Sequence, residues 1–446
     1  MDELFDFCKH VNRAFLSSEN SLSIEEARNV VQAINEFLYT NYDGIGKTFA
    51  VDKYYDYISD FHKYWEKHHE EILNCKIDEA NCVKVSDALH EINVLTKGKA
   101  FSMVNSDYKK SRLSPEEICR IRLLTANQDF KDSLDFSKLV KVYRRDPSIF
   151  DEKFIYENPI DFLKNIDVYR LGQIDKREKY AKNFSYFIMG HANNPYELIN
   201  SYGNDLFKLR NDMINCEGAG YGDKKTDMVL RDMVISEIWS GVQGFEKINV
   251  ASDRNTIKVA LRTGIISTAI PLVSSFLDIF CYQYSYIDKM NVASWRKVWE
   301  IWNKKYPEDN IKSPCQIDFF VYNVVGKQFC KQNLFIFEGE PCGHVFAWHS
   351  GQNKTCQVCF KEKRIKNRAK VIKKVMPCDD ERGIVAIQNT EFYKSLPKNK
   401  KINACPFRNI CKNKNLMPPK SISIFGSTGW TSAYTRRSDG GGGLMA

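Results

Sequence analysis

The segment "GAGYGDKKTDMVLRD" (residues 218–232) places a glycine-rich turn directly before an amphipathic run that predicts a helix. Glycine allows the positive φ of a tight turn and a close approach of the backbone to another group, so Gly220 and Gly222 suit the turn. The first N–H groups of a helix bind phosphate readily. Thr226 is a small residue at which two flanking helices can pack. We therefore predict a phosphate-facing hairpin between two amphipathic helices. The Gly-x-Gly spacing alone is weak evidence, and the flanking helices strengthen it.

The 446-residue chain is long enough for two or three domains with a buried core, and its formal net charge is +9. Much of the positive charge lies in "KEKRIKNRAKVIKK" (361–374), where eight lysine and arginine residues accompany one glutamate. A run of this kind favours a polyanionic partner, although a solvated helix face would have the same composition.

The sequence contains no recognisable targeting or membrane-spanning segment. Its first residues, MDELFDFCKH, lack the basic and then apolar pattern of a secretory signal. The longest uncharged stretch, residues 264–277, contains Pro271 and is too short to span a bilayer. We expect a soluble, cytoplasmic protein that has no membrane partner.

Apolar residues recur at helical spacing along most of the chain, and few segments alternate with the period of a strand, which predicts a mainly α fold. Ser114, Pro115 and Glu117 form a clear start signal, because they provide a capping residue, a proline in the first helical position and an acid in the first turn. Helices are expected at 112–130, 161–171, 178–190, 195–214, 223–240, 253–266, 270–288, 292–305 and 315–331.

The composition divides the chain into four segments. Residues 1–110 are helical and charged and predict an N-terminal extension, and residues 111–335 predict the main helical body. Residues 336–415 hold closely spaced cysteine and histidine residues among basic ones and predict a small metal-binding module. The last segment, 416–446, is rich in serine, threonine and glycine and is expected to be disordered.

The cysteine-rich segment has the ligand spacing of a structural zinc site. A Cys-x-His pair at 342–344 and a Cys-x2-Cys pair at 356–359 are separated by eleven residues, and each short pair can hold a tetrahedral ion from one loop. The predicted ligands are Cys342, His344, Cys356 and Cys359, with His349 and Cys378 as alternative ligands.

In Gly220-Tyr221-Gly222-Asp223-Lys224 and the later "SDRNTIKVALRTGI" (252–265), the chain resembles the helix-hairpin-helix DNA glycosylases, the superfamily of endonuclease III and 8-oxoguanine glycosylase. That family carries a Gly-x-Gly-x-Lys hairpin and then an aspartate that opens a later helix, and Lys224 and Asp253 occupy these positions here. "LLTANQ" (123–128) resembles the helix end that carries the family's duplex-wedging side chain. The three matches lie in the family's order within 112–335, about half of the chain.

The resemblance implies a two-lobed helical enzyme that flips a base out of duplex DNA and cleaves its N-glycosidic bond. Cleavage builds positive charge on the sugar, and the Asp253 carboxylate would stabilise that charge or activate the nucleophile. Asp253 would also cap its helix, and the two roles are compatible. Lys224 would be either the nucleophilic amine of a strand-nicking enzyme or an ordinary phosphate contact.

The expected DNA contacts follow from the same resemblance. Asn127 and Gln128 are the candidates to fill the gap that a flipped base leaves. The full set of expected DNA-binding residues is Gly220, Gly222, Lys225, Asn127 and Gln128.

The chain also departs from the family. Ala219 stands where a proline usually precedes the hairpin, and Ala251-Ser252 stand where Pro-Val usually precedes the acid. These departures bear more on strand nicking than on base removal. Endonuclease-III-like members end in an iron–sulfur loop whose last pair has the spacing of Cys405 and Cys411, but the other cysteines are spread more widely here, so zinc is favoured over an iron–sulfur cluster.

The expected substrate is a modified base in double-stranded DNA, bound by a monomer. The family includes housekeeping repair enzymes and defence enzymes that remove bulky modified cytosines, such as glucosylated hydroxymethylcytosine, from phage DNA. The N-terminal extension and the metal-binding module favour the defence branch. The alternatives are a housekeeping repair glycosylase with lyase activity, a non-catalytic helix-hairpin-helix DNA-binding protein, and an RNA-processing factor that recognises RNA through the metal-binding module.

Overall fold

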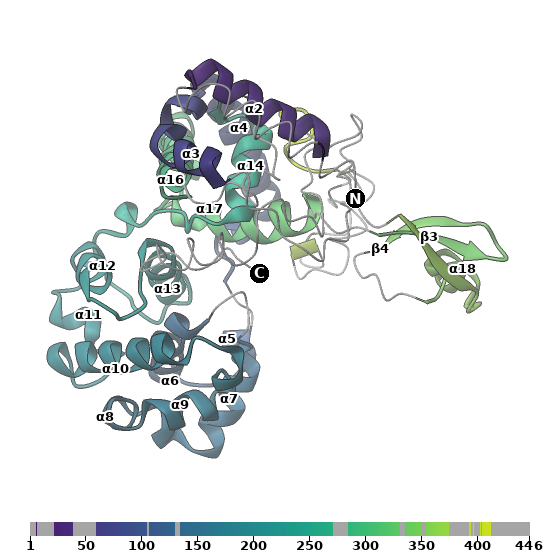
Figure 1. The fold of residues 1–446 in the computed structure, drawn as a ribbon. Coiled ribbons are helices and arrows are strands. Elements are labelled where there is room, and N and C mark those ends of the chain that lie inside the picture. The colour runs from purple at the N-terminus through teal and green to yellow at the C-terminus, as the bar shows by residue number, and fades with distance from the viewer. Residues whose placement is uncertain are drawn as a thin grey trace. The chain divides into compact units, whose positions relative to one another are not determined.

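The computed structural model of the chain describes residues 22–38, 59–104, 107–129, 134–270, 284–330, 335–348 and 354–373, together with 6, 392, 393, 396, 402 and 404–411. Helices dominate these residues, and their strands form two small sheets, which confirms the prediction of a mainly α fold (Figure 1). The predicted tail at 416–446 lies outside the described residues, as does most of the helix predicted at 270–288.

The chain divides into two compact units. The first unit contains residues 1–96, 253–307 and 321–446, and the second contains 97–252 and 308–320. This division differs from the predicted boundaries at residues 110 and 335. The N-terminal residues form a unit with later segments because their apolar side chains bury against helices from those segments.

The second unit is built from short helices around one apolar core that includes Phe150, Phe162 and Phe184. Its α-helices are α5 (Asp107–Lys110), α6 (Pro115–Thr125), α7 (Phe136–Arg145), α8 (Glu152–Glu157), α9 (Pro159–Asn165), α10 (Ile174–His191), α11 (Leu198–Ser201), α12 (Leu206–Asn215), α13 (Asp223–Ile235) and α17 (Cys315–Phe319). Its 3-10 turns are η1 (Lys99–Phe101), η2 (Ala126–Gln128), η3 (Pro147–Phe150), η4 (Tyr169–Leu171) and η5 (Phe245–Lys247).

Local capping explains where several of these helices begin. At α6 the Ser114 hydroxyl accepts from the Glu117 backbone N–H while the Glu117 carboxylate accepts from the Ser114 N–H, so the predicted start signal is confirmed. The helix predicted at 195–214 is instead divided into α11 and α12. Gly203 and Asn204 have positive φ between them, and the Asp205 carboxylate caps α12.

A buried network of ionic and hydrogen-bonding side chains joins four helices of the second unit, α5, α6, α13 and α17. The Asp232 carboxylate of α13 accepts from Tyr108 at 2.8 Å, from Arg122 at 3.2 Å and from Arg231 at 2.7 Å. Arg231 also pairs with Asp318 of α17, which returns to this unit late in the sequence. Burial alone would raise the pKa of Asp232, but Arg231 and Arg122 hold that pKa below its ordinary value.

In the described part of the first unit, the fully buried Trp295 and Trp302 of one long helix lie in the core. The sheet pairs Lys76 with Ser267 and Ile77 with Ile266 in antiparallel register. The elements are α2 (Ile24–Leu38), α3 (Ser59–Leu73), β1 (Lys76–Ile77), α4 (Glu79–Thr96), α14 (Arg254–Thr263), β2 (Ile266–Ser267), α16 (Tyr284–Lys305) and the π-helix η8 (Phe320–Phe329), with η7 (Pro307–Asp309) at the junction with the second unit.

The described residues between 335 and 373, which belong to the predicted metal-binding module, form three strands and one helix. Strands β3 (Phe335–Glu340), β4 (Val345–Trp348) and β5 (Arg368–Lys373) form an antiparallel sheet in the order β4-β3-β5. Helix α18 (Gln357–Lys363) connects β4 to β5 along the chain.

Candidate functional site

The hairpin predicted at residues 218–222 joins α12 to α13, which lie side by side in the second unit (Figure 1). Gly220 has φ +74°, and a Cβ there would lie 2.4 Å from the Tyr180 ring. Gly222 has an extended backbone, and a Cβ there would meet open space. Only Gly220 of the predicted pair is therefore required sterically for the turn.

The hairpin is fixed to α6 through Tyr221, and Thr226 lies in the first turn of α13. The buried Tyr221 hydroxyl donates to the Leu123 carbonyl oxygen at 2.5 Å, and its ring lies 4.4 Å from the Phe184 ring. Thr226 is completely buried, as expected of the small residue at the helix contact. Tyr221 therefore anchors the turn to α6.

The N-terminus of α13 is open to solvent. Its N-cap residue is Gly222, which has no side chain to bond the first N–H groups, and Gly222, Asp223 and Lys224 are all exposed. The Asp223 carboxylate accepts from Arg210 at 2.6 Å, so its negative charge is paired. A helix end without a side-chain cap and with an exposed lysine suits a phosphate group.

The two neighbouring lysines of the hairpin differ in environment. Lys224 is exposed, whereas the Lys225 amine is largely withdrawn from solvent and donates to the Asn127 carbonyl oxygen at 2.9 Å. Burial lowers the pKa of Lys225 to about 7; Asp129 opposes this shift, and Lys224, Arg177 and Lys176 add to it. Part of the Lys225 population is therefore neutral at neutral pH.

Asn127 and Gln128 do not have the exposure that a duplex-wedging side chain needs. Both are 0% exposed. The Asn127 amide donates to the carbonyl oxygens of Tyr180 and Ala219 at 3.1 and 3.0 Å, and the Gln128 amide donates to the Arg177 carbonyl oxygen at 3.1 Å. We therefore correct their predicted role, because the Asn127 amide bonds both the hairpin and α10, and the Gln128 amide bonds α10, instead of facing DNA.

Asp253 is the N-cap residue of α14, as the sequence predicts. Its Oδ1 accepts from the backbone N–H groups of Asn255 and Thr256 at 2.9 and 2.8 Å. The Thr256 hydroxyl accepts from the Asp253 N–H at 2.9 Å and from Asn291 of α16 at 3.0 Å. Asp253 is 8% exposed, so the carboxylate is held in one orientation at the edge of the protein interior.

The second oxygen of Asp253 has an acceptor position left over. Its Oδ2 accepts from the Asn255 side-chain amide at 3.0 Å. A carboxylate oxygen can accept about two hydrogen bonds. Among the described residues, the bonds to Asp253 therefore fill Oδ1 and occupy half of Oδ2. The remaining position on Oδ2 can face a positively charged group or a water molecule.

The predicted site residues are divided between the two units. The hairpin glycines, Lys224, Lys225, Asn127 and Gln128 lie together in the second unit, whereas Asp253 belongs to the first. Each group has its own local geometry.

The four predicted metal ligands are brought together in the metal-binding module. The sulfurs of Cys342, Cys356 and Cys359 and one ring nitrogen of His344 all lie within 4.8 Å of one another. The His344 Nδ1 atom is 3.2 Å from the Cys359 sulfur and 3.9 Å from the Cys356 sulfur. Three sulfurs and one imidazole nitrogen form a complete tetrahedral donor set for a metal ion.

The backbone around the metal-ligand cluster is shaped to bring the sulfurs close. A Cβ on Gly339 would lie 2.4 Å from the Cys342 sulfur and 2.9 Å from the Cys356 sulfur, so no side chain fits there. The Asn367 amide donates to the Cys359 sulfur at 3.3 Å, a contact of the kind that orients metal ligands.

Cys342 and Cys359 of the metal-ligand cluster have different thiol pKa values. The His344 backbone N–H donates to Cys342 and lowers the pKa of that thiol to about 6, which favours the thiolate form that binds metal. Burial raises the pKa of Cys359 to about 11. Binding of a cation would therefore release a proton from Cys359.

The alternative metal ligands do not change this assignment. His349 and Cys378 lie outside the described residues. Cys405 and Cys411 are described but do not belong to the cluster, and no other group of three or more possible ligands occurs in the described part of the chain. The geometry thus favours a four-ligand site over an iron–sulfur loop that includes Cys405 and Cys411.

The basic run 361–374 covers the end of α18, the following turn and β5. The described lysine and arginine residues in it are exposed: Lys361, Lys363, Arg364, Lys366, Arg368 and Lys370. Cys356 and Cys359 lie at the start of α18, and the Cys356 N–H donates to the Asn367 carbonyl oxygen at 2.8 Å. The metal ligands and the positive surface are therefore parts of one small structure.

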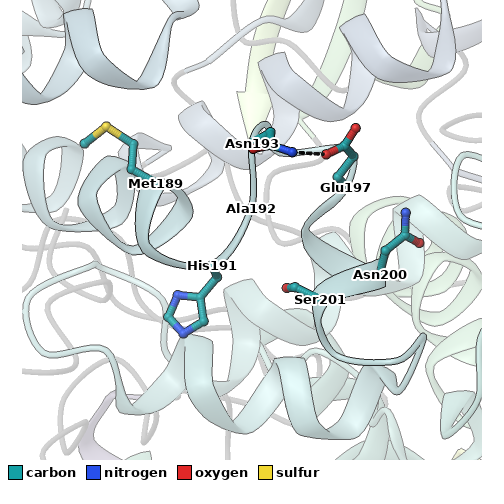
Figure 2. A pocket seen from close by; sticks show the side chains of 7 residues that line it. All are labelled: Met189, His191, Ala192, Asn193, Glu197, Asn200 and Ser201. Atoms are coloured by element: carbon teal, nitrogen blue, oxygen red, sulfur yellow. Dashed lines mark hydrogen bonds between the residues drawn. The ribbon is translucent and has the colours of Figure 1, made fainter.

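A hollow of about 410 Å³ lies where α10 leads into α11, and Figure 2 shows the side chains around it. It is lined mainly by polar residues, including His191, Asn193, Glu197 and Ser201. His191 Nδ1 bonds to the Phe187 carbonyl oxygen at 2.8 Å, and Asn193 donates to Glu197 at 3.1 Å. These groups stabilise the turn and form no catalytic pair with each other.

Comparison of the chain with protein-family models and with curated proteins finds no match. Within the described residues, none of the helices combines the length and apolar character needed to cross a membrane. The candidate sites therefore rest on the geometry of the hairpin, of Asp253 and of the metal-ligand cluster.

Proposed function

We propose that this chain is a DNA glycosylase that removes a modified base from double-stranded DNA and leaves an abasic site. Asp253 carries the proposal, because its carboxylate is nearly buried, oriented by three hydrogen bonds and left with one acceptor position on Oδ2. The order of the hairpin and this aspartate in the sequence, and their resemblance to the helix-hairpin-helix glycosylases, supply the reaction class.

Cleavage of an N-glycosidic bond develops positive charge at the sugar carbon as the base departs. A fixed carboxylate stabilises that charge more effectively in a water-poor site than in bulk water. Asp253 can act in this way or can orient a water molecule for attack on the sugar. Either role leaves the DNA strand unbroken and yields an intact abasic site.

The hairpin supplies DNA binding in this proposal. The open N-terminus of α13 faces a phosphate, and the exposed Lys224 pairs with the same backbone. If the enzyme also nicks the strand, the amine must be neutral before it attacks the opened sugar. The lowered pKa of Lys225 makes its amine better suited to that step than the amine of Lys224, the residue that the resemblance indicates.

The metal-binding module would bind zinc and present its basic surface to the DNA backbone. Its three cysteines and one histidine leave no position for substrate, which is the pattern of a structural zinc site. A catalytic metal would need an open coordination position. The module therefore contributes to affinity in this proposal and takes no part in the chemical step.

The substrate that we favour is a bulky modified cytosine, such as the glucosylated hydroxymethylcytosine of phage DNA, which would give the protein a role in anti-phage defence. The chain combines a glycosylase-like hairpin with additional N-terminal helices and a metal-binding module, unlike a compact repair enzyme. Repair of damaged bases is the alternative within the same reaction class.

Release of free base tests the proposal. The purified full chain is incubated with genomic DNAs that carry different base modifications, and released bases are identified by mass spectrometry. The expected result is one modified base set free by the native protein and none by Asp253→Asn. Duplex binding without base release from any DNA would instead indicate a non-catalytic DNA-binding protein. Preferential binding of RNA over duplex DNA would favour an RNA-binding role for the metal-binding module.

A further inference from the structure

A buried lysine lies one turn after Asp253 on α14. Lys258 is only 3% exposed, and its amine donates to the Gly326 carbonyl oxygen at 3.0 Å and to the Asn255 side-chain oxygen at 3.4 Å. Burying an ammonium group is unfavourable unless hydrogen bonds and opposite charge compensate. Lys258 thus bonds to Asn255, and Asn255 in turn bonds to Asp253.

Lys258 and Asp253 hold the Asn255 amide from its two ends. An ammonium group can only donate hydrogen bonds, so Lys258 requires the oxygen of the Asn255 amide on its own side. The opposite end of the same amide, the NH2 group, then points at Asp253 Oδ2, which it contacts at 3.0 Å. Without Lys258, the Asn255 oxygen would lose the partner that holds its side of the amide, and only the bond to Asp253 would keep the amide in place.

The π-helix η8 contacts Lys258 and Asn255 through Gly326. A Cβ on Gly326 would lie 2.7 Å from Asn255 Cβ and 3.2 Å from the Asn255 carbonyl oxygen, so only glycine permits this approach. Gly326 lies in the last turn of η8, where carbonyl groups need partners outside the helix. Lys258 supplies such a partner and fixes η8 against the start of α14.

We propose that Lys258 and Asn255 are positioning residues that orient Asp253 Oδ2 for the reaction. Lys258 sets the orientation of the Asn255 amide, and Asn255 holds one side of Oδ2, so that the remaining acceptor position points in a single direction. This inference rests on the proposed glycosylase function for the reaction but on the contacts of α14 and η8 for the geometry. A purely structural Lys258 would stabilise the first unit without affecting the carboxylate.

Two measurements separate these roles. Crystal structures of the full chain, native and Lys258→Met, report whether the Asn255 amide still donates to Asp253. Loss of that contact in the variant is expected, and its retention near 3.0 Å would overturn the proposal whether or not the protein is a glycosylase. Failure of the proposed function is seen separately, as absence of base release by the native protein.

Kinetics provide the second measurement, on the modified DNA that the native protein cleaves. Lys258→Met is expected to lower kcat by about 10- to 100-fold with little change in KM, because a misplaced catalytic group affects mainly the transition state. Lys258→Arg, which keeps a donor for Asn255, is expected to restore most of kcat. If Lys258→Met folds poorly, Asn255→Leu removes the same contact to Asp253 and should lower kcat equally.

Arg262 supplies a matched control. It is also on α14 and also 3% exposed, but it lies one further turn from Asp253. Arg262→Met is expected to lower the melting temperature without lowering the kcat of the folded enzyme. Equal loss of kcat in Arg262→Met and Lys258→Met would show that general destabilisation accounts for both, which would refute a positioning role.

Discussion

Helix α13 follows the glycine-rich turn and helix α14 follows Asp253, and the two helices begin in opposite ways. Helix α13 begins after Gly222, whose N-cap position offers no side-chain bond and is exposed. Helix α14 begins after Asp253, whose carboxylate bonds two backbone N–H groups and completes a capping box with Thr256. Both helix ends attract negative charge, but only the end of α13 is left available to an external anion.

The difference shows that the first N–H groups of a helix can be left without a side-chain cap at one place and be capped by a carboxylate at another. At α13 the N–H groups have no side-chain cap and suit a phosphate that arrives from outside. At α14 the same groups are used internally to hold a carboxylate in a fixed orientation. An aspartate at the N-cap therefore occupies the N–H groups that could otherwise bind an anion, and these groups fix the orientation of its carboxylate.

Loss of the charge at Asp253 is the largest expected effect. Asparagine caps a helix as well as aspartate does, so Asp253→Asn should preserve the fold while base release falls by about 1000-fold, or about 4 kcal/mol. Mass spectrometry of released base and a thermal melt of the same sample check both parts.

Asp205 provides the control for that variant. It caps α12 by accepting from the N–H groups of Phe207 and Lys208, much as Asp253 caps α14. Asp205→Asn should leave base release unchanged. If both variants lose activity alike, the loss reflects a general effect of replacing a capping aspartate and not the carboxylate charge at Asp253.

The glycines of the hairpin should differ strongly in stability. Gly220→Ala introduces a Cβ against the Tyr180 ring at a positive φ, which we expect to destabilise the protein by about 3 kcal/mol. Gly222→Ala meets open space and an extended backbone, so its effect on folding should be below about 1 kcal/mol. Chemical denaturation of the two variants measures the difference, and equal losses would show that the turn does not have this geometry.

Removal of metal should weaken DNA binding while the hairpin remains intact. Cys356→Ser deletes one ligand of the metal-binding module, whose fold then loses its tetrahedral ion. Duplex affinity should fall by about 10-fold, with a shallower dependence on salt because fewer phosphates are contacted. Metal analysis and binding titrations at several salt concentrations test this. Cys216→Ser, at a half-buried cysteine outside the metal-ligand cluster, should change neither metal content nor affinity.

Lys225 should make stability depend on pH. Its pKa is about 7 in the folded protein, below the ordinary value of 10.5, because burial disfavours the charged amine. Between these two pKa values the unfolded chain binds more protons, so this residue should make stability rise with pH from about 7 to about 10.5. Below pH 7 both states are protonated, and the full destabilisation by the buried charge is present.

A comparison with Lys225→Met isolates this effect. Melting temperatures measured across the pH range should rise more steeply for the native protein than for the variant. The charged groups that face the amine are Asp129, Lys224, Arg177 and Lys176, and all four are present in both proteins. Parallel curves would contradict the lowered pKa.

The sequence predicts local features of this molecule well and distant contacts poorly. The capping box at Ser114, the N-cap role of Asp253 and the grouping of the four metal ligands each depend on residues within a short segment. Short-range spacing fixes such features. The mainly α fold follows in the same way from helical periodicity.

The features that the sequence does not predict depend on residues far apart in the chain. Asn127 and Gln128 end a helix, as a wedge would, but their burial depends on α10, some fifty positions later. Lys224 and Lys225 are adjacent, and only the contact of Lys225 with Asn127 distinguishes them. Lys258 likewise acquires its role through Gly326. Periodicity reports which face of a helix is buried but not which element covers it.

Adding a capping side chain to α13 tests the comparison of the two helix ends. Its expected effect is the smallest of all. Gly222→Ser supplies a hydroxyl that can accept from the first N–H groups of α13, as the Asp253 carboxylate does at α14, and should stabilise the protein by a few tenths of a kcal/mol. The same hydroxyl competes with phosphate for those groups. Duplex affinity should therefore fall by about two- to fivefold, at unchanged net charge. An increase in stability without any loss of affinity would mean that DNA does not use this end of α13, and that the exposed Lys224 binds the backbone without help from the helix.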